Sequence, residues 1–308
     1  MTITNLLGIK YPIFQGAMAQ IARHELVSAV SNAGALGILA SGGVSPEELR
    51  KEIRLCKEFT DKPFAVNLML MMPNIDEIID VVIEEGVKIV TTGAGTPRKF
   101  MSRLKEAGIK VIPVIPSVKA AVKMEELGCD AVVVEGMEAG GHVGTSTTMA
   151  LLPQVTSAVN IPVIAAGGIA DGRGMAAAYC LGANGVQMGT VFLASEECPV
   201  TDAYKNMILE AVDTSTTLTG EKFGAPVRGI KNELTKRYHE LEEQSSTLME
   251  LEELTLGSLR RAVYDGDVEN GSVMAGQIAG LVNEIRPVKN IIEDVIKEAR
   301  EVLKKTEI

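Results

Sequence analysis

The stretches PVIAAGG (residues 162–168) and GVQMGTVFLA (residues 185–194) decide the fold. Each is continuously apolar rather than alternating, which is typical of a strand buried on both faces of a parallel sheet. Toward the N-terminus, runs of the same kind recur, with charged, amphipathic stretches between them. The earlier runs span residues 12–18, 36–41, 63–70, 88–95, 110–117 and 131–136.

Eight runs at a spacing of about 25 residues predict an α/β fold, a (β/α)8 TIM barrel. The charged stretches between the runs read as helices, and the expected N-caps of three of them are Ser45, Asn74 and Thr96. A doubly wound sheet is the competing fold. When it binds a dinucleotide, that fold usually carries GxGxxG after its first strand, whereas the first run here ends in GAM.

The alternation of apolar runs and charged stretches accounts for residues 1–195, which we expect to form the barrel, and it does not continue beyond them. Residues 196–271 contain a Gly-, Pro- and Thr-rich stretch followed by a charged helical stretch, and we expect them to form a helical lid over the barrel mouth. Residues 272–308 begin with the small, apolar SVMAGQIAG and end in an amphipathic helix. We expect this C-terminal segment to return to the barrel.

The composition argues against several classes of protein. The 308-residue chain has a formal net charge of −10, which disfavours general binding to nucleic acid or to an anionic membrane. No apolar run reaches membrane-spanning length, and residues 1–10 do not resemble a signal peptide. The four cysteines form no CxxC pair, so we expect reduced thiols in a cytoplasmic protein. The three histidines are scattered, so we expect no metal site.

Glycines lie at the end of the seventh run and within the eighth, where a TIM barrel usually binds phosphate. GGIADG starts at Gly167 and Gly168, and QMGT ends in Gly189 and Thr190. Glycine lets backbone N–H groups approach an anion closely, and a helix N-terminus adds a favourable dipole. Tight turns without a ligand are the alternative for a single pair of glycines. Two such turns at these strands favour a phosphate site.

The sixth run leads into EGMEAGGHVG, residues 135–144, which places His142 among glycines at the end of a strand. A histidine there suits proton transfer or the polarisation of a carbonyl, and an ordinary exposed loop histidine is the alternative. His24 and His239 are expected to be solvated surface residues. Asn67 and Gln15 are polar side chains within apolar runs, so each needs a partner, either a ligand or a neighbouring backbone group.

Six motifs, taken in order, resemble the superfamily of nitronate monooxygenases and flavin-dependent enoyl-acyl-carrier-protein reductases. They are PIFQGAM, VNLML, EGMEAGGHVG, IPVIAAGGIADG, VQMGT and SVMAGQIAG, and the resemblance covers nearly the whole chain. The AGGH segment is common to both branches. EGMEAGGHVG followed by TTMALLPQV, and FGAPVRGIKN followed by SVMAGQIAG, are similar to the type II enoyl reductases in particular.

The resemblance implies a bound FMN and either NADH or NADPH as the hydride donor, and His142 matches the active-site histidine of the superfamily. It implies that the flavin phosphate lies on the glycines after the last two runs and the ring lies near the first and third. The residues it places around FMN are Ala17, Met18, Asn67, Glu135, Gly167, Gly168, Gln187, Met188, Gly189, Thr190, Gly276 and Gln277.

The implied reaction reduces the trans-2 double bond of an enoyl-acyl-carrier protein. A nicotinamide delivers hydride to the flavin, and the flavin delivers it to the β-carbon before the α-carbon is protonated. His142 could stabilise the thioester oxygen, supply the proton or only orient the substrate, and these roles stay open. The alternatives are a nitronate monooxygenase, which uses the same FMN site with oxygen as acceptor, and a non-redox phosphate-binding barrel enzyme.

The partner implied by the resemblance is an acidic acyl-carrier protein, and we expect the enzyme itself to be a homodimer. Because the chain is acidic, any attraction must come from a local basic patch. The basic residues concentrate in the expected lid and its flanks, at Arg228, Lys231, Lys236, Arg237, Arg260 and Arg261. The alternative is that these charges are solvated and paired with Glu233, Glu240 and Glu242.

Overall fold

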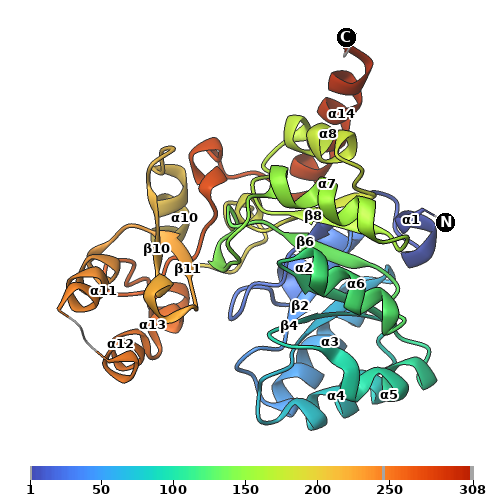
Figure 1. The fold of residues 1–308 in the computed structure, drawn as a ribbon, viewed down its shortest axis with the longest axis horizontal. Coiled ribbons are helices and arrows are strands. Elements are labelled where there is room, and N and C mark those ends of the chain that lie inside the picture. The colour runs from blue at the N-terminus through green and yellow to red at the C-terminus, as the bar shows by residue number, and fades with distance from the viewer. Residues whose placement is uncertain (1, 245–246, 306–308) are drawn as a thin grey trace.

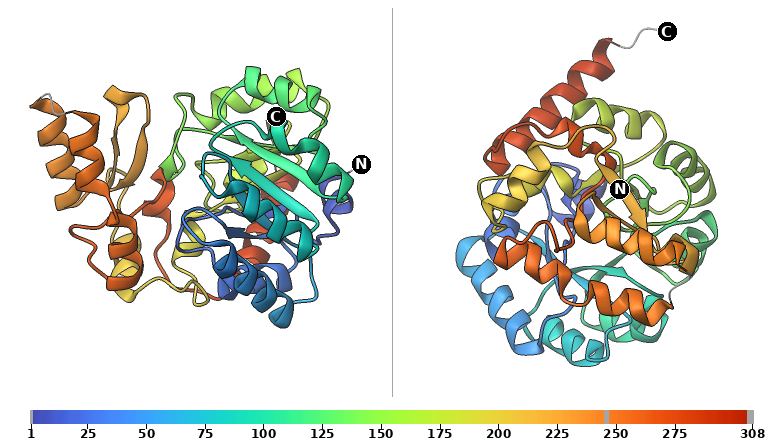
Figure 2. Two further views of the ribbon diagram at one scale, coloured as in Figure 1. Left: turned by 90° about the horizontal axis from the view of Figure 1, so that it is seen from below. Right: turned by 90° about the vertical axis from the view of Figure 1, so that its left-hand side faces the viewer.

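A computed structural model of the chain describes residues 2–244 and 247–305. Its main body is an eight-stranded parallel barrel surrounded by helices (Figures 1 and 2). The barrel strands are β1 (Ile13–Gln15), β2 (Gly37–Ala40), β3 (Phe64–Met69), β4 (Ile89–Gly93), β5 (Lys110–Ile115), β6 (Val132–Glu135), β8 (Val163–Ala166) and β9 (Gly185–Met188). The predicted TIM barrel is confirmed.

The barrel closes between its first two strands. Parallel pairing runs from β2 through β3, β4, β5, β6, β8 and β9 to β1. The backbone N–H of Leu36 then donates to Ile13 O at 2.9 Å, and the N–H of Gln15 donates to Leu36 O at the same distance. The eighth run is shorter as a strand than predicted, because after Gly189 the chain turns into the short helix α9 (Thr190–Leu193).

Helices connect the strands on the outside of the barrel. They are α2 (His24–Asn32), α3 (Pro46–Phe59), α4 (Ile75–Glu84), α5 (Met101–Glu106), α6 (Val118–Glu126), α7 (Thr148–Ala158) and α8 (Gly172–Cys180). Ser45 caps α3 with a capping box, as predicted. Asn74 precedes α4, but its side-chain amide donates to Val44 O instead of capping the helix, and Thr96 precedes a 3-10 turn, Pro97–Phe100, without a side-chain cap.

Two apolar layers hold the barrel together. Inward-facing residues of the strands, such as Phe14, Ile38 and Ile112, form one cluster, and the larger cluster lies between the strands and the helices. The N-terminal helix α1 (Ile3–Leu7) contributes Ile3 and Leu7 to the inner cluster. One apolar layer therefore joins α1 to the barrel interior.

A second body is built from the segment that follows the barrel (left in Figure 1). It contains α10 (Asp202–Leu209), β10 (Thr216–Thr219), β11 (Val227–Ile230), α11 (Glu233–Glu243), α12 (Leu248–Thr255), α13 (Ser258–Arg260) and a π-helical turn, Arg261–Asp265. We call this body, residues 202–265, the lid.

The lid contains the expected helices, α10 to α13, and two strands that the sequence did not predict. Strands β10 and β11 pair in antiparallel fashion, and β11 also pairs with β7 (Gly141–His142), a two-residue strand that comes from the barrel. The physical reason lies in the Thr-rich stretch, because β-branched residues favour strands. Gly220 and Gly224, at φ +76° and +70°, take left-handed conformations in the connection between β10 and β11.

The C-terminal segment returns to the barrel wall. Helix α14 (Val288–Lys305) packs on α8, where a Cβ on Gly172 would lie only 2.3 Å from the backbone N of Ala299. The Glu298 carboxylate also accepts the Gly172 N–H at 2.7 Å. Across residues 2–244 and 247–305, no helix is both long and apolar enough to cross a membrane.

Candidate active site

The carboxyl ends of β8 and β9 carry glycines that form a candidate seat for an anion, which we call the anion seat. Gly167 and Gly168 follow β8 with φ of +87° and +74°, and Gly189 follows β9 at the start of α9. The backbone N–H groups of these three glycines donate to no other described residue. Because β8 and β9 are neighbours in the barrel, the free N–H groups lie at one edge of the sheet, as phosphate recognition requires.

The loop after β1 approaches the same seat. Gly16 donates its N–H to Met188 O at 2.8 Å, and a Cβ on Gly16 would lie 3.3 Å from the side chain of Gln187. The sulfur of Met18 lies 3.7 Å from the position that a Cβ on Gly189 would take. The structure thus brings the predicted residues of β9 together with residues 16–18, a loop that also includes Ala17.

The C-terminal segment closes one side of this region. Gly276 donates its N–H to the hydroxyl of Thr190 at 2.9 Å, and Gln277 donates its N–H to Glu138 O at 2.9 Å. A Cβ on Gly276 would lie 2.7 Å from Glu138 O, so only glycine fits there without a shift of the backbone. Gly276 and Gln277, separated from β9 by more than eighty residues, therefore lie at the mouth of the barrel.

Glu138 and Thr148 also belong to this region, and the sequence interpretation missed them. The N–H of Thr148, at the start of α7, donates to both carboxylate oxygens of Glu138 at 2.9 Å. The Thr148 hydroxyl lies 2.9 Å from Gly167 O, to which it donates. The available signal was the second glutamate of EGMEAGG, followed by the TTMALL helix start ten residues later.

Two polar side chains in the strands have protein partners. The Asn67 amide donates to the Thr91 hydroxyl at 2.8 Å. Gln15 is fully buried, its side-chain oxygen accepts the Ile38 N–H at 3.1 Å, and its amide donates to Gly16 O at 2.5 Å. Neighbouring backbone groups therefore bond both the oxygen and the nitrogen of the Gln15 side chain, which gives it a structural role in the barrel. Asn67 lies on β3 and is only partly buried.

Glu135 ends β6 and is the most perturbed carboxyl group of the barrel mouth. Burial raises the pKa of Glu135 to about 7. Its side chain makes no hydrogen bond or ion pair with the residues that the structure describes. A carboxyl group of this kind is partly protonated at neutral pH, so it can donate a hydrogen bond to a ligand or accept one from it.

His142 is exposed, and its imidazole has no partner among the described residues. It lies in β7, so the expected flexible loop is locally a strand. His142 pairs with Val227 of β11, and the N–H of Val143 donates to Pro226 O at 3.1 Å. The backbone of the histidine is fixed by the lid, while its ring remains free to meet a ligand.

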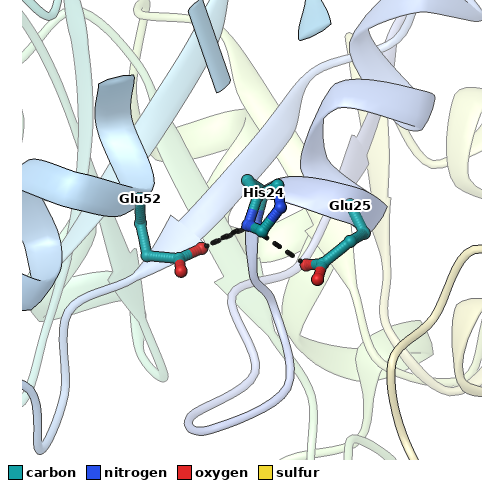
Figure 3. Close-up of side chains that lie close together, drawn as sticks. All are labelled: His24, Glu25 and Glu52. Carbon is teal, nitrogen blue, oxygen red and sulfur yellow. Dashed lines mark hydrogen bonds and ion pairs between the residues drawn. The ribbon is translucent and has the colours of Figure 1, made fainter. Parts of the chain in front are cut away.

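The other two histidines lie elsewhere. The His24 side chain is only 16% exposed, so the expectation of a solvated residue was wrong. Its Nδ1 lies 3.0 Å from Glu52 and 3.3 Å from Glu25 (Figure 3). Histidine and carboxylates are metal-ligand types, but Glu52 also accepts the backbone N–H of His24 at 2.9 Å, which satisfies the start of α2. His239 lies 3.1 Å from the Thr217 hydroxyl in the lid.

Three features therefore lie at the carboxyl ends of the barrel strands. They are the glycines of the anion seat, the partly protonated carboxyl group of Glu135 and the exposed His142, which follows β6. Such barrels place their chemistry at the carboxyl ends of the strands. The nitronate monooxygenase family model matches residues 1–78 and 74–298. The chain belongs to this family and is an oxidoreductase.

Individual relatives agree with this assignment. The chain is similar to FabK from Thermotoga maritima, with a TM-score of 0.96 and 51% identity over 99% of this chain and 98% of that one. It is 37% identical to a probable nitronate monooxygenase of Staphylococcus saprophyticus, over 98% of both chains. It is 36% identical to a 5-hydroxy-7a-methyl-1-oxo-octahydro-1H-indene-4-carboxyl-CoA dehydrogenase of Mycobacterium tuberculosis, over 96% of this chain and 95% of the relative.

Proposed function

We propose that the protein is an FMN-dependent enoyl-acyl-carrier-protein reductase that uses NADH or NADPH. The observation that carries the proposal is the 51% identity to FabK over nearly the whole of both chains, compared with 37% to the probable nitronate monooxygenase. The reductase-like segments FGAPVRGIKN and SVMAGQIAG support the same choice. The proposed reaction belongs to fatty-acid elongation.

The residues present fit a flavin mononucleotide. The free N–H groups of Gly167, Gly168 and Gly189 would hold one phosphate, and Thr190 stands beside them. The residues 16–18 loop follows β1 and Asn67 lies on β3, with β2 between them in the barrel, and a flat ring could rest against the backbone on this side of the barrel mouth. When bound, FMN would accept hydride from the nicotinamide and pass it to the β-carbon of the enoyl thioester.

The protein's own groups would then manage charge and protons. As hydride reaches the β-carbon, negative charge develops on the thioester oxygen, and the α-carbon takes one proton to complete the reduction. A donor positioned at that oxygen contributes about 3 to 4 kcal/mol. The free imidazole of His142 is suited either to this contact or to proton transfer. The carboxyl group of Glu135, with its raised pKa, is suited to a hydrogen bond with the flavin.

Anaerobic stopped-flow spectroscopy tests the proposal. We expect NADH or NADPH to bleach the bound flavin, and crotonyl thioester to restore its absorbance faster than oxygen does. A flavin that neither nicotinamide reduces would exclude the proposed activity. Reduction by a nicotinamide followed by reoxidation with oxygen alone would also exclude it.

Nitronate monooxygenase is the second candidate, and the family model and the Staphylococcus saprophyticus relative favour it. That activity needs no nicotinamide, so oxygen consumption with a nitronate and no NADH distinguishes the two. A non-redox phosphate-binding barrel would contain no flavin and would be colourless after purification.

A further inference from the structure

Arg228 is a buried cation: the carboxylates of Glu138 and Glu221 favour its charge from beyond salt-bridge distance, but burial outweighs them and lowers the pKa of the guanidinium. Arg228 is only 4% exposed, and its guanidinium forms no salt bridge within the described parts of the chain. Removing a guanidinium from water costs several kcal/mol unless the protein supplies strong contacts, so such a residue needs a reason to be there. The sequence interpretation counted Arg228 in an exposed basic patch, and its burial between β10 and β7 shows that this was wrong.

The contacts of Arg228 join the lid to the barrel loop that carries His142. Its Nε donates to Met137 O at 3.0 Å, and its Nη1 donates to the Thr216 hydroxyl of β10 at 3.1 Å. Its backbone pairs with Gly141, the residue before His142. One arginine therefore contacts the loop at both ends of the stretch from Met137 to Gly141.

This loop cannot fix the histidine by itself. Residues 135–144 include four glycines, which allow many backbone conformations. Outside contacts restrain it instead: the N–H of Met137 donates to Ser146 O at 2.8 Å, and the N–H of Val143 donates to Pro226 O. Arg228 is the one side chain of β11 that reaches back to the loop backbone, at Met137.

We propose that Arg228 is a positioning residue that holds the loop at Met137 and so sets the place of the His142 imidazole over the reaction site. His142 and Arg228 are offset by one position across the ladder, so their side chains project from opposite faces of the small sheet. Arg228 thus acts on the loop backbone and leaves the face of His142 to the ligand. The kinetic part of this inference rests on the proposed function.

The test uses Arg228→Met, which keeps an unbranched side chain but removes the donors, and a milder variant, Thr216→Val, which removes one acceptor of the guanidinium. Arg300→Met is the matched control, because Arg300 is an exposed arginine of α14, outside the lid and without a partner among the residues described. Each variant is made in the wild type and in the His142→Ala background. All are assayed as flavin-bound enzyme on crotonyl thioester.

We expect Arg228→Met to keep its flavin and to lower kcat by about 10- to 100-fold, because a displacement of ~1 Å can cost that much. KM should change much less, and Thr216→Val should show a smaller loss in the same direction. In the His142→Ala background, Arg228→Met should cost nothing further, since the group it positions is gone. Multiplicative losses in the double variant, or a wild-type kcat in Arg228→Met, would overturn the proposal.

A second measurement does not depend on the reaction. Amide hydrogen exchange over residues 138–146 should be faster in both variants than in Arg300→Met, while the barrel strands keep their protection. If wild-type enzyme fails to reduce the thioester, the proposed function has failed, and exchange still tests the positioning role. Unchanged exchange in this loop would show that Arg228 does not hold it.

Discussion

His142 pairs in antiparallel register with Val227, so the proposed active-site histidine is attached to the lid. The barrel supplies the candidate anion seat on β8 and β9, and the lid fixes the backbone of His142. A movement of the lid sheet would carry β7 with it and change the distance from His142 to the seat. The barrel thus supplies His142 and the lid fixes its backbone, and the lid also contacts the barrel where the Tyr264 hydroxyl donates to Gln20 O at 2.9 Å.

The first prediction concerns the cofactor. Heat-released flavin should co-migrate with FMN and not with FAD, because the free N–H groups at Gly167, Gly168 and Gly189 form one phosphate seat. FAD in that extract would refute the site assignment.

Substitution at the seat refines this prediction. Gly168→Asp should abolish flavin retention, because it places a carboxylate against the phosphate and near Glu138. Gly168→Ala is the matched control: it carries the same backbone strain at φ +74° and meets Glu138 at an ordinary 3.5 Å, but adds no charge. Fluorescence titration of each apoprotein with FMN measures the difference. Equal affinities for the two variants would place the phosphate elsewhere.

The second prediction concerns the exposed imidazole. His142→Ala should retain FMN and lose about 10²- to 10⁴-fold in turnover of enoyl thioester, the range for acid–base participation. Flavin content per chain and single-turnover reoxidation by crotonyl thioester would be measured on the same sample. Wild-type reoxidation rates in a flavin-loaded variant would mean that His142 takes no part in the reaction.

The third prediction follows from the raised pKa of Glu135. A carboxyl group whose pKa rises to about 7 on folding favours the folded state while it is protonated. The contribution of the protonated Glu135 to the free energy of unfolding is complete below about pH 4.5, and it is lost as the pH rises toward 7. Urea unfolding of the apoprotein should therefore show that Glu135→Gln gains stability over wild type across this window, by at most about 1.4 kcal/mol per pH unit. Parallel pH profiles for the two proteins would contradict the assigned pKa.

The barrel and the helices of the lid could be predicted from the sequence, but the strands of the lid could not. Continuous apolar runs such as residues 162–168 predict barrel strands, because a strand that is buried on both faces needs apolar side chains at every position. The four residues Thr216–Thr219 are short and only partly buried, and their partner β11 follows two glycines, so they carry no such signal. Strand β7 has two residues and exists only because β11 lies beside it.

The site residues that could be predicted from the sequence are those whose position depends only on the strand beside them in the chain. Gly167 and Gly168 follow their strand directly, so a strand prediction places them at the barrel mouth. The role of Gln15 depended on Ile38, which lies on the next strand, and the burial of Arg228 depended on β10 and β7. A single sequence does not show which long side chain turns inward, because that choice is made by tertiary contacts.

The last prediction concerns the carrier protein, and the structure reduces the expected basic patch. Arg228 is buried, and Arg261 donates to Leu256 O at 3.1 Å and to Asn270 O at 3.2 Å, so it holds the end of the lid together. Lys236 lies 3.8 Å from Glu233, as the alternative of paired charges expected. Arg237 and Arg260 remain without a carboxylate partner in the described chain, and the Arg260 guanidinium lies 5.6 Å from the Tyr264 ring centre.

If an acidic carrier protein docks here, Arg237→Glu and Arg260→Glu should each raise KM for enoyl-carrier-protein by about fivefold, which corresponds to the ~1 kcal/mol of an exposed ion pair. KM for a short enoyl thioester should stay unchanged, and added salt should reduce the effect. Lys88→Glu is the control, because it makes the same change of charge at an exposed, unpaired lysine. Lys88 lies just before β4, at the end of the barrel opposite the carboxyl ends of the strands. This variant should leave KM unchanged for both enoyl-carrier-protein and the short thioester. Arg261→Glu should instead lower the melting temperature. Equal rises in KM for carrier-bound and short thioesters would show that Arg237 and Arg260 act at the catalytic site and not in docking. If Lys88→Glu raised KM for enoyl-carrier-protein as much as the two arginine variants do, the effect would come from net charge alone.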